Sequence, residues 1–320
     1  MPQPAPPPSP VDRVALEHVL ARLARAPTAP WLHQEVARRM AERLPLIRQA
    51  PLQWLDWWGH LGGGAASVAA VWPKATRWVV EPTDALVSAS RLSMRGPWWS
   101  VWQRSTRARR VMHQDDVGSG QAQMIWANLM LHASVDPVAT MAQWFAALPV
   151  AGFIMFSTFG PDSLRELREV FAEQGWPSPH PPFVDMHNIG DQLVGTGFTD
   201  PVMDQQRLSL SWSSASALID ELRTLGGHLG RARFQGLRTP RWREQLRRAL
   251  ERRADAQGRI HLSFELVFGH AFKAQPKPGR AEVTTVSLES LRSNLRDSRT
   301  ARSAALTTAQ ATVPTKGVGG

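Results

Sequence analysis

The stretch WLDWWGHLGGGAASVAAV, at residues 54–71, decides the fold class of this chain. It begins with five residues that are apolar except for Asp56, as is typical of a short buried strand. Gly59 and the triplet 62–64 then end the strand, and a helix is predicted from Ala65 onward. Such strand–turn–helix units hold nucleotide-like ligands in α/β folds, because glycine lets a ligand approach the backbone beyond the carboxyl end of the strand.

Further strands and helices flank this stretch. Two helices are predicted before it, at 11–26 and 33–44. After it, the hydrophobic pattern predicts strands at 77–81, 111–113, 122–127 and 152–158, and helices at 83–92, 137–148 and 162–174. Strands that alternate with helices in this way indicate a parallel sheet with helices on both faces.

The period of the pattern changes after Phe198. Residues 208–212 and 260–264 alternate strictly between apolar and polar side chains, which is typical of half-exposed antiparallel strands. An arginine-rich helical region, 213–258, lies between them. We therefore expect an α/β domain that ends in an antiparallel hairpin, with 213–258 as a helical lid or docking insertion.

Composition sets the limits of this domain. Residues 1–10 are more than half proline, so they are expected to form a disordered arm. Residues 275–320 are polar and basic and lack periodicity, so they are expected to form a disordered tail. The folded domain is predicted to span residues 11–274.

Several classes of function are disfavoured by what the sequence lacks. There is no cysteine, which excludes disulfides, thiolate metal sites and iron–sulfur clusters. The 10 histidines show no metal-ligand spacing, and neither a P-loop nor a GxSxG turn occurs. No apolar run reaches the roughly 18 residues of a membrane helix, and no secretory signal is visible. We therefore expect a soluble, cytoplasmic protein with no metal and no membrane partner.

The chain is strongly basic, with a formal net charge of +10. Residues 231–253 contain nine arginines and only two glutamates. Such a field attracts an acidic partner, whether a nucleic acid, an anionic lipid or an acidic protein. The alternative is a solvated helix face with no partner.

One acidic residue fits the nucleotide interpretation of the glycine turn. Glu81 ends the second predicted strand and follows Gly62 by 19 residues. A carboxylate at this place can accept hydrogen bonds from both ribose hydroxyls. The alternative is a plain strand–helix turn with a surface acid after it.

Seven segments spread along the chain together suggest a family. They are HQEVARRM (33–40), WANLMLH (126–132), FSTFGPDSLRELR (156–168), FVDMHNIGD (183–191), GFTDPVMD (197–204), LRTLGGH (222–228) and FELVFGHAFK (264–273). As a collinear set they resemble the biotin-pathway malonyl-acyl-carrier-protein O-methyltransferases. The likeness covers about residues 11–275.

The resemblance implies a Rossmann-like, seven-stranded methyltransferase sheet with helices on both faces, N-terminal helices and a C-terminal antiparallel hairpin. It also implies S-adenosyl-L-methionine as the cofactor. The residues that would hold it are Asp56, Gly59, Gly62 and Gly63 at the methionine end, Glu81 at the ribose, Asp115 or Asp116 near the adenine, and Asn128 after the fourth strand.

The same resemblance implies the reaction, methylation of the free carboxylate of a malonyl thioester on an acyl-carrier protein. That carboxylate is ionised at neutral pH and needs no general base. An arginine suits the task of holding it, because the guanidinium binds carboxylates bidentately. Arg223 is the first candidate and Arg165 the second. The basic 231–253 region would then dock the acidic carrier protein.

The sequence departs from the family at the glycine turn. Trp58, His60 and Gly62 stand where the family places three glycines. An alternative function is therefore a catalytically degenerate paralogue that keeps the fold and acts as a binding or regulatory protein. Nucleic-acid binding is a third hypothesis, and it rests on charge alone.

Overall fold

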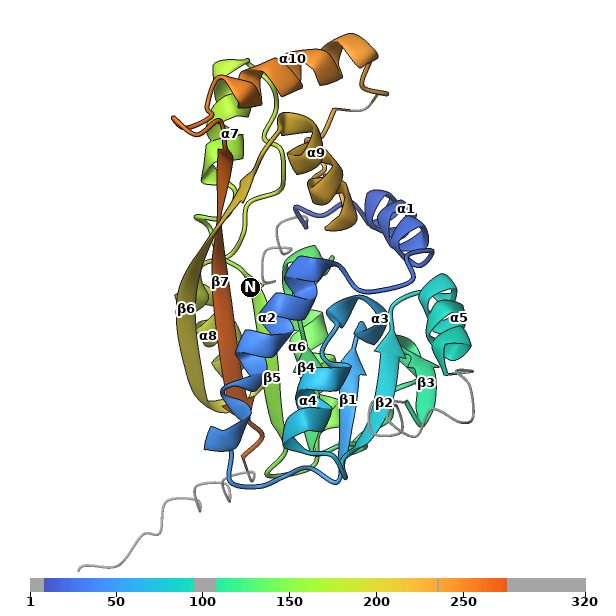
Figure 1. Cartoon of the computed structure of the whole chain (residues 1–320). Coiled ribbons are helices and arrows are strands. Elements are labelled where there is room, and N and C mark those ends of the chain that lie inside the picture. The colour runs from blue at the N-terminus through green and yellow to red at the C-terminus, as the bar shows by residue number, and fades with distance from the viewer. Residues whose placement is uncertain (1–8, 95–107, 235, 275–320) are drawn as a thin grey trace, which may run out of the picture. The chain divides into compact units, whose positions relative to one another are not determined.

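The computed structural model describes residues 9–94, 108–234 and 236–274. Within these residues a single sheet of seven strands forms the centre, in the order β3-β2-β1-β4-β5-β7-β6 (Figure 1). The strands are β1 Gln53–Trp57, β2 Thr76–Glu81, β3 Arg110–His113, β4 Met124–Ala127, β5 Phe153–Phe159, β6 Thr199–Trp212 and β7 Ile260–Phe272.

The pairing of the strands confirms the predicted sheet and its closing hairpin. β1 pairs in parallel with β2 on one side and with β4 on the other, and β5 continues the parallel part beside β4. β7 lies antiparallel to both β5 and β6. The chain thus leaves β1 toward β2 and later returns to the other side of β1 with β4. Open α/β sheets bind ligands at such a switch point, beyond the carboxyl ends of the strands.

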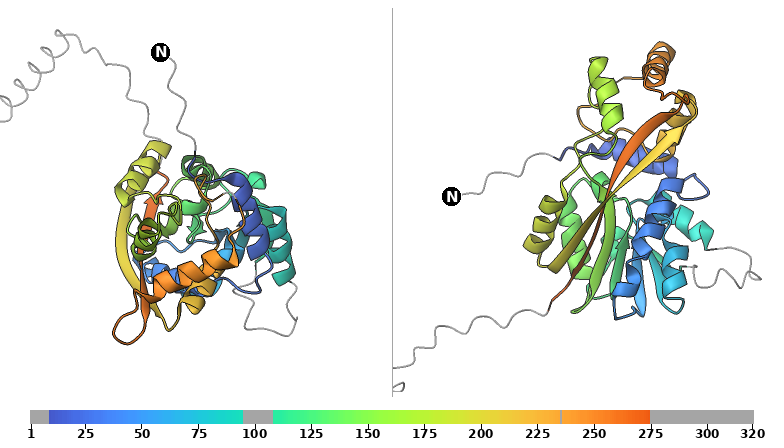
Figure 2. Two further views of the ribbon diagram at one scale, coloured as in Figure 1. Left: turned by 90° about the horizontal axis from the view of Figure 1, so that it is seen from above. Right: turned by 60° about the vertical axis from the view of Figure 1, so that its left-hand side comes forward.

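Helices cover both faces of the sheet (Figure 2). They are α1 Arg13–Leu23, α2 Trp31–Ala41, α3 Gly59–Gly62, α4 Ala65–Val71, α5 Asp84–Ser93, α6 Pro137–Ala147, α7 Arg165–Glu173, α8 Met186–Thr196, α9 Ala215–Thr224 and α10 Pro240–Glu251. One buried cluster joins the sheet to α1, α5, α6 and α8, and a second joins it to α2, α4, α7, α9 and α10. The short helix α3 and the helix α8 were not predicted.

The strand β1 shows how alternation fixes the position of its one polar residue. Leu55 and Trp57 belong to the first cluster, whereas Trp54 belongs to the second. Successive strand residues point to opposite faces, so Asp56 lies on the same face as Trp54. Its side chain is completely buried there.

Three helices, α7, α9 and α10, lie beyond the carboxyl ends of the parallel strands (Figure 1); we call them the distal helices. The strands β6 and β7, of 14 and 13 residues, are long enough to reach them. Aromatic contacts join the distal helices, since the ring of Trp242 on α10 lies 6.2 Å from that of Phe171 on α7. The predicted insertion 213–258 contains α9 and α10.

The helix α1 is attached to the chain that follows α9. Val11 forms an isolated antiparallel bridge with Gly230, and Arg231 N donates to Pro10 O at 3.1 Å. Residues 1–8 of the predicted arm and the whole predicted tail, 275–320, lie outside the described residues. In the part of the chain that the structure describes, no helix has the length and hydrophobicity to cross a membrane.

Candidate active site

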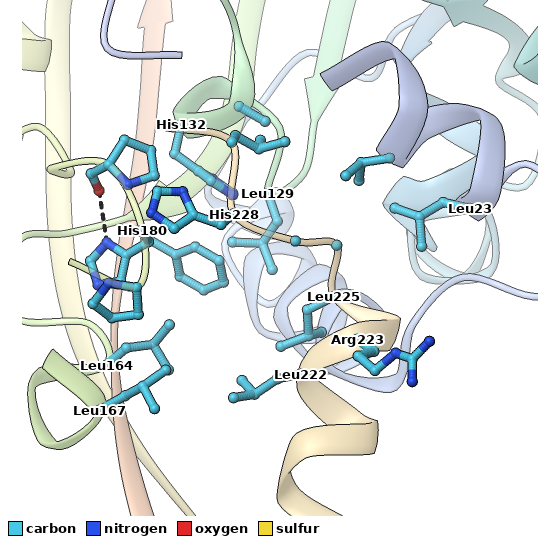
Figure 3. Close-up of a pocket in the computed structure, with 18 of the residues that line it drawn as sticks. Leu23, Leu129, His132, Leu164, Leu167, His180, Leu222, Arg223, Leu225 and His228 are labelled. Atoms are coloured by element: carbon cyan, nitrogen blue, oxygen red, sulfur yellow. Dashed lines mark hydrogen bonds between the residues drawn. The ribbon is translucent and has the colours of Figure 1, made fainter. Parts of the chain in front are cut away.

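A cavity of about 600 Å³ lies between the carboxyl ends of β4 and β5 and the distal helices. Figure 3 shows that leucines and histidines form much of its wall. Its lining includes Asn128 and Leu129, which follow β4, together with Leu20 of α1 and Leu222 of α9. A largely apolar hollow with a few polar groups, placed at the switch point of a sheet, is the usual setting of a small-molecule site.

Asn128 is the polar residue that anchors this end of the sheet. Its Nδ2 donates to His33 O at 2.8 Å and to Gly62 O at 2.6 Å, and its Oδ1 accepts from Ser157 Oγ at 2.6 Å. The side chain is 1% exposed. Because both donor hydrogens are used by the protein, Asn128 ties α2 and the glycine turn to β4 and β5.

The glycines after β1 are required by close packing within the protein. A Cβ added at Gly59 would lie 2.8 Å from Asp56 Cγ, and one added at Gly64 would lie 2.2 Å from Trp126 Nε1. Gly63 has a φ of +66°, in the region that favours glycine. At Gly62, by contrast, an added Cβ would meet nothing closer than Asp56 Oδ1 at 3.7 Å. Close packing therefore does not require a glycine at position 62.

Asp56 is paired with an arginine of the neighbouring strand. Its Oδ2 accepts from Arg77 on β2, at 2.8 Å from Nε and 2.6 Å from the second guanidinium nitrogen. Burial raises the pKa of the Asp56 carboxyl, and the guanidinium of Arg77 opposes that rise. The pair holds β1 and β2 together directly below the glycine turn.

Glu81, the predicted ribose acceptor, is enclosed by the turn itself. Its Oε1 accepts from His60 N at 2.8 Å and from Ser90 Oγ at 2.7 Å. The side chain is 0% exposed, and this burial raises the pKa of Glu81 to about 8. Its second oxygen, Oε2, is buried and accepts no hydrogen bond from the described residues.

Trp58 and Leu61, two apolar residues of the same turn, are buried. Trp58 has a φ of +56°, in the left-handed region where a residue with a bulky side chain is strained. Both side chains are 6% exposed and share a buried cluster with Leu16 and Leu20 of α1. Trp58, which stands where the family has a glycine, thus belongs to one buried cluster with the amino-terminal helix.

The structure does not bring all the predicted cofactor residues to one cavity. Asn128 lines it, whereas Asp56, Gly59, Gly62, Gly63 and Glu81 are not among its lining residues. Asp115 and Asp116 are exposed, on a short 3-10 turn after β3. Trp58 and Leu61 of the glycine turn do line the cavity, and both are buried.

The donor set nevertheless suits an adenosyl cofactor. Oε2 of Glu81, which has no partner within the described residues, can accept a ribose hydroxyl, and a Cβ at Gly62 would make only ordinary contacts with Asp56 and Asn128. In this structure the carboxyl group of Glu81 has no exposed surface, so a ribose has no direct access to it.

The two predicted arginines differ in position. Arg223, at the end of α9, belongs to the cavity lining, but its side chain is exposed, and in Figure 3 its guanidinium points away from Leu222 and Leu225. Its carbonyl accepts from the guanidinium of Arg22 at 2.9 Å. Arg165 is the first residue of α7; it is exposed and is not among the lining residues.

Sequence reasoning missed a group of histidines in the cavity wall. Burial lowers the pKa of His33 to about 4 and that of His132 to about 3, so both are neutral at physiological pH. His180 stacks on Phe183 at 4.4 Å between ring centroids, and burial lowers its pKa too. Two of the three lie in family-like segments, HQEVARRM and WANLMLH, and that was the signal available in the sequence.

The sheet order, the antiparallel β7 and the glycine turn at the switch point define a Rossmann-like, S-adenosylmethionine-dependent methyltransferase. The chain is 35% identical over 258 residues to the malonyl-[acyl-carrier protein] O-methyltransferase of Laribacter hongkongensis, which covers 79% of this chain and 86% of that protein. It is 32% identical over 276 residues to the enzyme of the same name from Gallionella capsiferriformans, covering 84% and 94%. The chain belongs to the malonyl-[acyl-carrier protein] O-methyltransferase family.

No protein-family model matches the chain. Among solved structures, it is similar to the YcgJ protein of Bacillus subtilis, with a TM-score of 0.48 and 13% identity over 76% of this chain and 99% of that one.

Proposed function

We propose that the chain transfers a methyl group from S-adenosyl-L-methionine to the free carboxylate of a malonyl thioester carried by an acyl-carrier protein, in the cytoplasm, as a step of biotin synthesis. Family membership supports the reaction class. The observation that carries the proposal is the apolar cavity, which has Asn128 and the glycine-turn residue Trp58 in one wall and the distal helices in the other.

The reaction asks for positioning more than for acid–base chemistry. The cofactor supplies an electrophilic methyl group on a sulfonium. The malonyl carboxylate is ionised at pH 7 and attacks without a general base, because carboxyl pKa values lie near 4. The neutral His33 and His132 therefore do not need to accept a proton. Leu129 and the other apolar lining residues exclude water, which would compete as a hydrogen-bond partner for the carboxylate.

The residues proposed to hold the cofactor belong to the glycine turn and to the ends of the neighbouring strands. Glu81 would accept a ribose hydroxyl at Oε2, and Asp56, Gly59, Gly62, Gly63 and Asn128 would shape the methionine end, with Asp115 or Asp116 near the adenine. In this set Asn128 acts through the turn, since it holds Gly62 O at 2.6 Å.

The cation that holds the malonyl carboxylate is proposed to be Arg223, with Arg165 as the second candidate. Arg223 belongs to the cavity lining, and its flexible, exposed side chain can turn inward. A bidentate guanidinium–carboxylate contact would orient the nucleophilic oxygen.

The carrier protein is proposed to be acidic and to dock on the region 213–258. The charge of this region is partly neutralised inside the protein, because five of its arginines pair with acids: Arg233, Arg243, Arg247, Arg248 and Arg253. Several of these acids, such as Asp12 and Glu169, come from other parts of the chain. The exposed Arg241 and Arg252 have no ion pair within the described residues, so both are available to a partner.

The test is methyl transfer to purified carrier proteins, followed by mass spectrometry of the intact carrier. The malonyl form should gain one methyl group, and the acetyl form, which has no free carboxylate, should gain none. Arg223→Met should raise KM for the malonyl carrier at least about tenfold, whereas Arg165→Met should leave it unchanged if Arg223 is the binding residue. The absence of transfer by a folded protein that receives saturating cofactor would exclude the proposed reaction and leave the degenerate paralogue.

A further inference from the structure

A second cation in the cavity wall lies between two aromatic rings. The guanidinium carbon of Arg238 is 4.2 Å from the ring centroid of Phe234 and 4.3 Å from that of Trp242. Arg238 and Trp242 both line the cavity. Stacking on two aromatic faces fixes the plane of a guanidinium and leaves its edge, which carries the N–H donors, free to bind.

Arg238 has no acidic partner among residues 9–94, 108–234 and 236–274, unlike five other arginines of the same region. The guanidinium is half-buried, and this burial lowers its pKa. Beside it, the buried indole Nε1–H of Trp242 donates to no acceptor within the described residues. Two adjacent side chains thus present donors and one positive charge without an acceptor, which is the composition of an anion site.

The position of this pair indicates the shape of the ligand. Asn128 follows β4, whereas Arg238 directly precedes α10, and Figure 1 shows α10 beyond α9 on the side away from the sheet. The wall between them is apolar and includes Leu164, Leu167 and Leu222. Next to Arg238, Leu237 is 96% exposed, so Arg238 lies where the cavity wall reaches the protein surface. A ligand that spans the cavity is therefore long, with its anion at the outer end.

We propose that Arg238 and Trp242 bind the phosphate of the phosphopantetheine arm on which the carrier protein presents its acyl group. This inference rests on the proposed function. The arm has a phosphate at the carrier end and the thioester at the other, so a phosphate held at Arg238 directs the malonyl group toward Asn128. The anion site and the methyl-transfer site are then at opposite ends of one cavity.

The test compares two soluble substrates that differ only in the phosphate, malonyl-phosphopantetheine and malonyl-pantetheine. Calorimetry should show that the wild-type protein binds the phosphorylated arm at least ~10-fold more tightly, as expected for one charge-assisted contact. Arg238→Met should abolish this ratio by weakening only the phosphorylated arm. Arg238→Lys should keep part of it, because an ammonium retains the charge but not the stacked plane. Arg91→Met, at an exposed position of α5 outside the cavity lining, should leave the ratio unchanged.

The possible results distinguish failure of the phosphate site from failure of the proposed function. Equal affinity of the wild-type protein for the two arms, together with methylation of both, would overturn the phosphate site and leave the proposed function intact. A full phosphate preference in Arg238→Met, with circular dichroism showing a folded protein, would also overturn it. If the wild-type protein neither binds nor methylates either arm, the proposed function itself fails and the phosphate site fails with it.

Discussion

The backbone N–H of His60 donates to Oε1 of Glu81 at 2.8 Å, which joins the glycine turn after β1 to the acid at the end of β2. Here the turn forms the short helix α3, and its backbone satisfies one carboxylate oxygen. The other oxygen stays without a partner in the described part of the chain, and its burial has measurable consequences for stability.

Stability should fall as the pH rises from 6.5 to 8. The folded state raises the pKa of Glu81 from 4.5 to about 8, so between these values the folded state binds a proton that the unfolded state has lost. The contribution is fully present below pH 4.5 and is lost as the pH rises through 8. From pH 6.5 to 8 the free energy of unfolding should drop by roughly 2 kcal/mol, at 1.36 kcal/mol per pKa unit. Urea unfolding at several pH values measures it.

The variant Glu81→Gln isolates this group. Its amide oxygen can still accept from His60 N and Ser90 Oγ, but it does not titrate. The free energy of unfolding of the variant should be nearly flat over the same pH range. A decline as steep as that of the wild-type protein would show that another group causes it.

Below pH 6.5 the opposite trend is expected: the free energy of unfolding should fall as the pH falls. His132 should cause part of this loss. Burial lowers its pKa from 6.5 to about 3, so the folded state lacks a proton that the unfolded state binds below pH 6.5. Stability is therefore lost as the pH falls, by roughly 2 kcal/mol between pH 6.5 and 5 for one such group. In His132→Phe, whose ring can pack between Phe159 and Phe183, this loss should be smaller by that amount. If His132→Phe loses as much stability as the wild-type protein between pH 6.5 and 5, His132 is not the cause.

Asn128 should contribute to stability more than any exposed asparagine. Asn128→Ala removes three buried hydrogen bonds and leaves His33 O and Gly62 O without their donor. The free energy of unfolding should drop by about 3 kcal/mol. The matched control, Asn188→Ala at an exposed position of α8, should change it by less than about 0.5 kcal/mol. Similar losses in the two variants would mean that the hydrogen bonds of Asn128 have little net value.

Local pattern was enough to predict the sheet and most helices. The helix predicted from Ala65 runs over Ala65–Val71, and the helix predicted at 83–92 runs over Asp84–Ser93, where Thr83 caps it by accepting from Leu86 N. These features depend on neighbouring residues. The same is true of the change in period after Phe198, which predicted the hairpin of β6 and β7.

The site was harder to predict because its geometry depends on contacts distant in sequence. Burial of Trp58 against Leu20 of α1 goes together with a left-handed backbone that local propensity disfavours. The ion pairs of the arginine-rich region with distant acids could not be predicted either, since Asp12 pairs with Arg233 across 221 positions. Both contacts join residues that are far apart in the sequence, so the local pattern around either residue does not predict them.

Replacing Trp58 should decide whether the turn limits cofactor binding. Trp58→Gly removes the indole from the turn that contacts Glu81 through His60 N, and it places glycine at a φ of +56°, where it is unstrained. The affinity for S-adenosylhomocysteine, measured by calorimetry, should rise about tenfold, which corresponds to about 1.4 kcal/mol. Loss of the buried ring should at the same time lower the melting temperature, because the indole is 6% exposed in a packed cluster.

The control is Trp58→Phe, which keeps a ring in the cluster and a bulky side chain on the left-handed backbone. Its affinity for S-adenosylhomocysteine should stay close to that of the wild-type protein, so a gain in the glycine variant would be due to the emptied space. If the glycine variant remains folded and binds no more tightly than the phenylalanine variant, Trp58 does not obstruct the site. The enclosure of Glu81 would then depend on its bond to His60 N, which neither substitution removes.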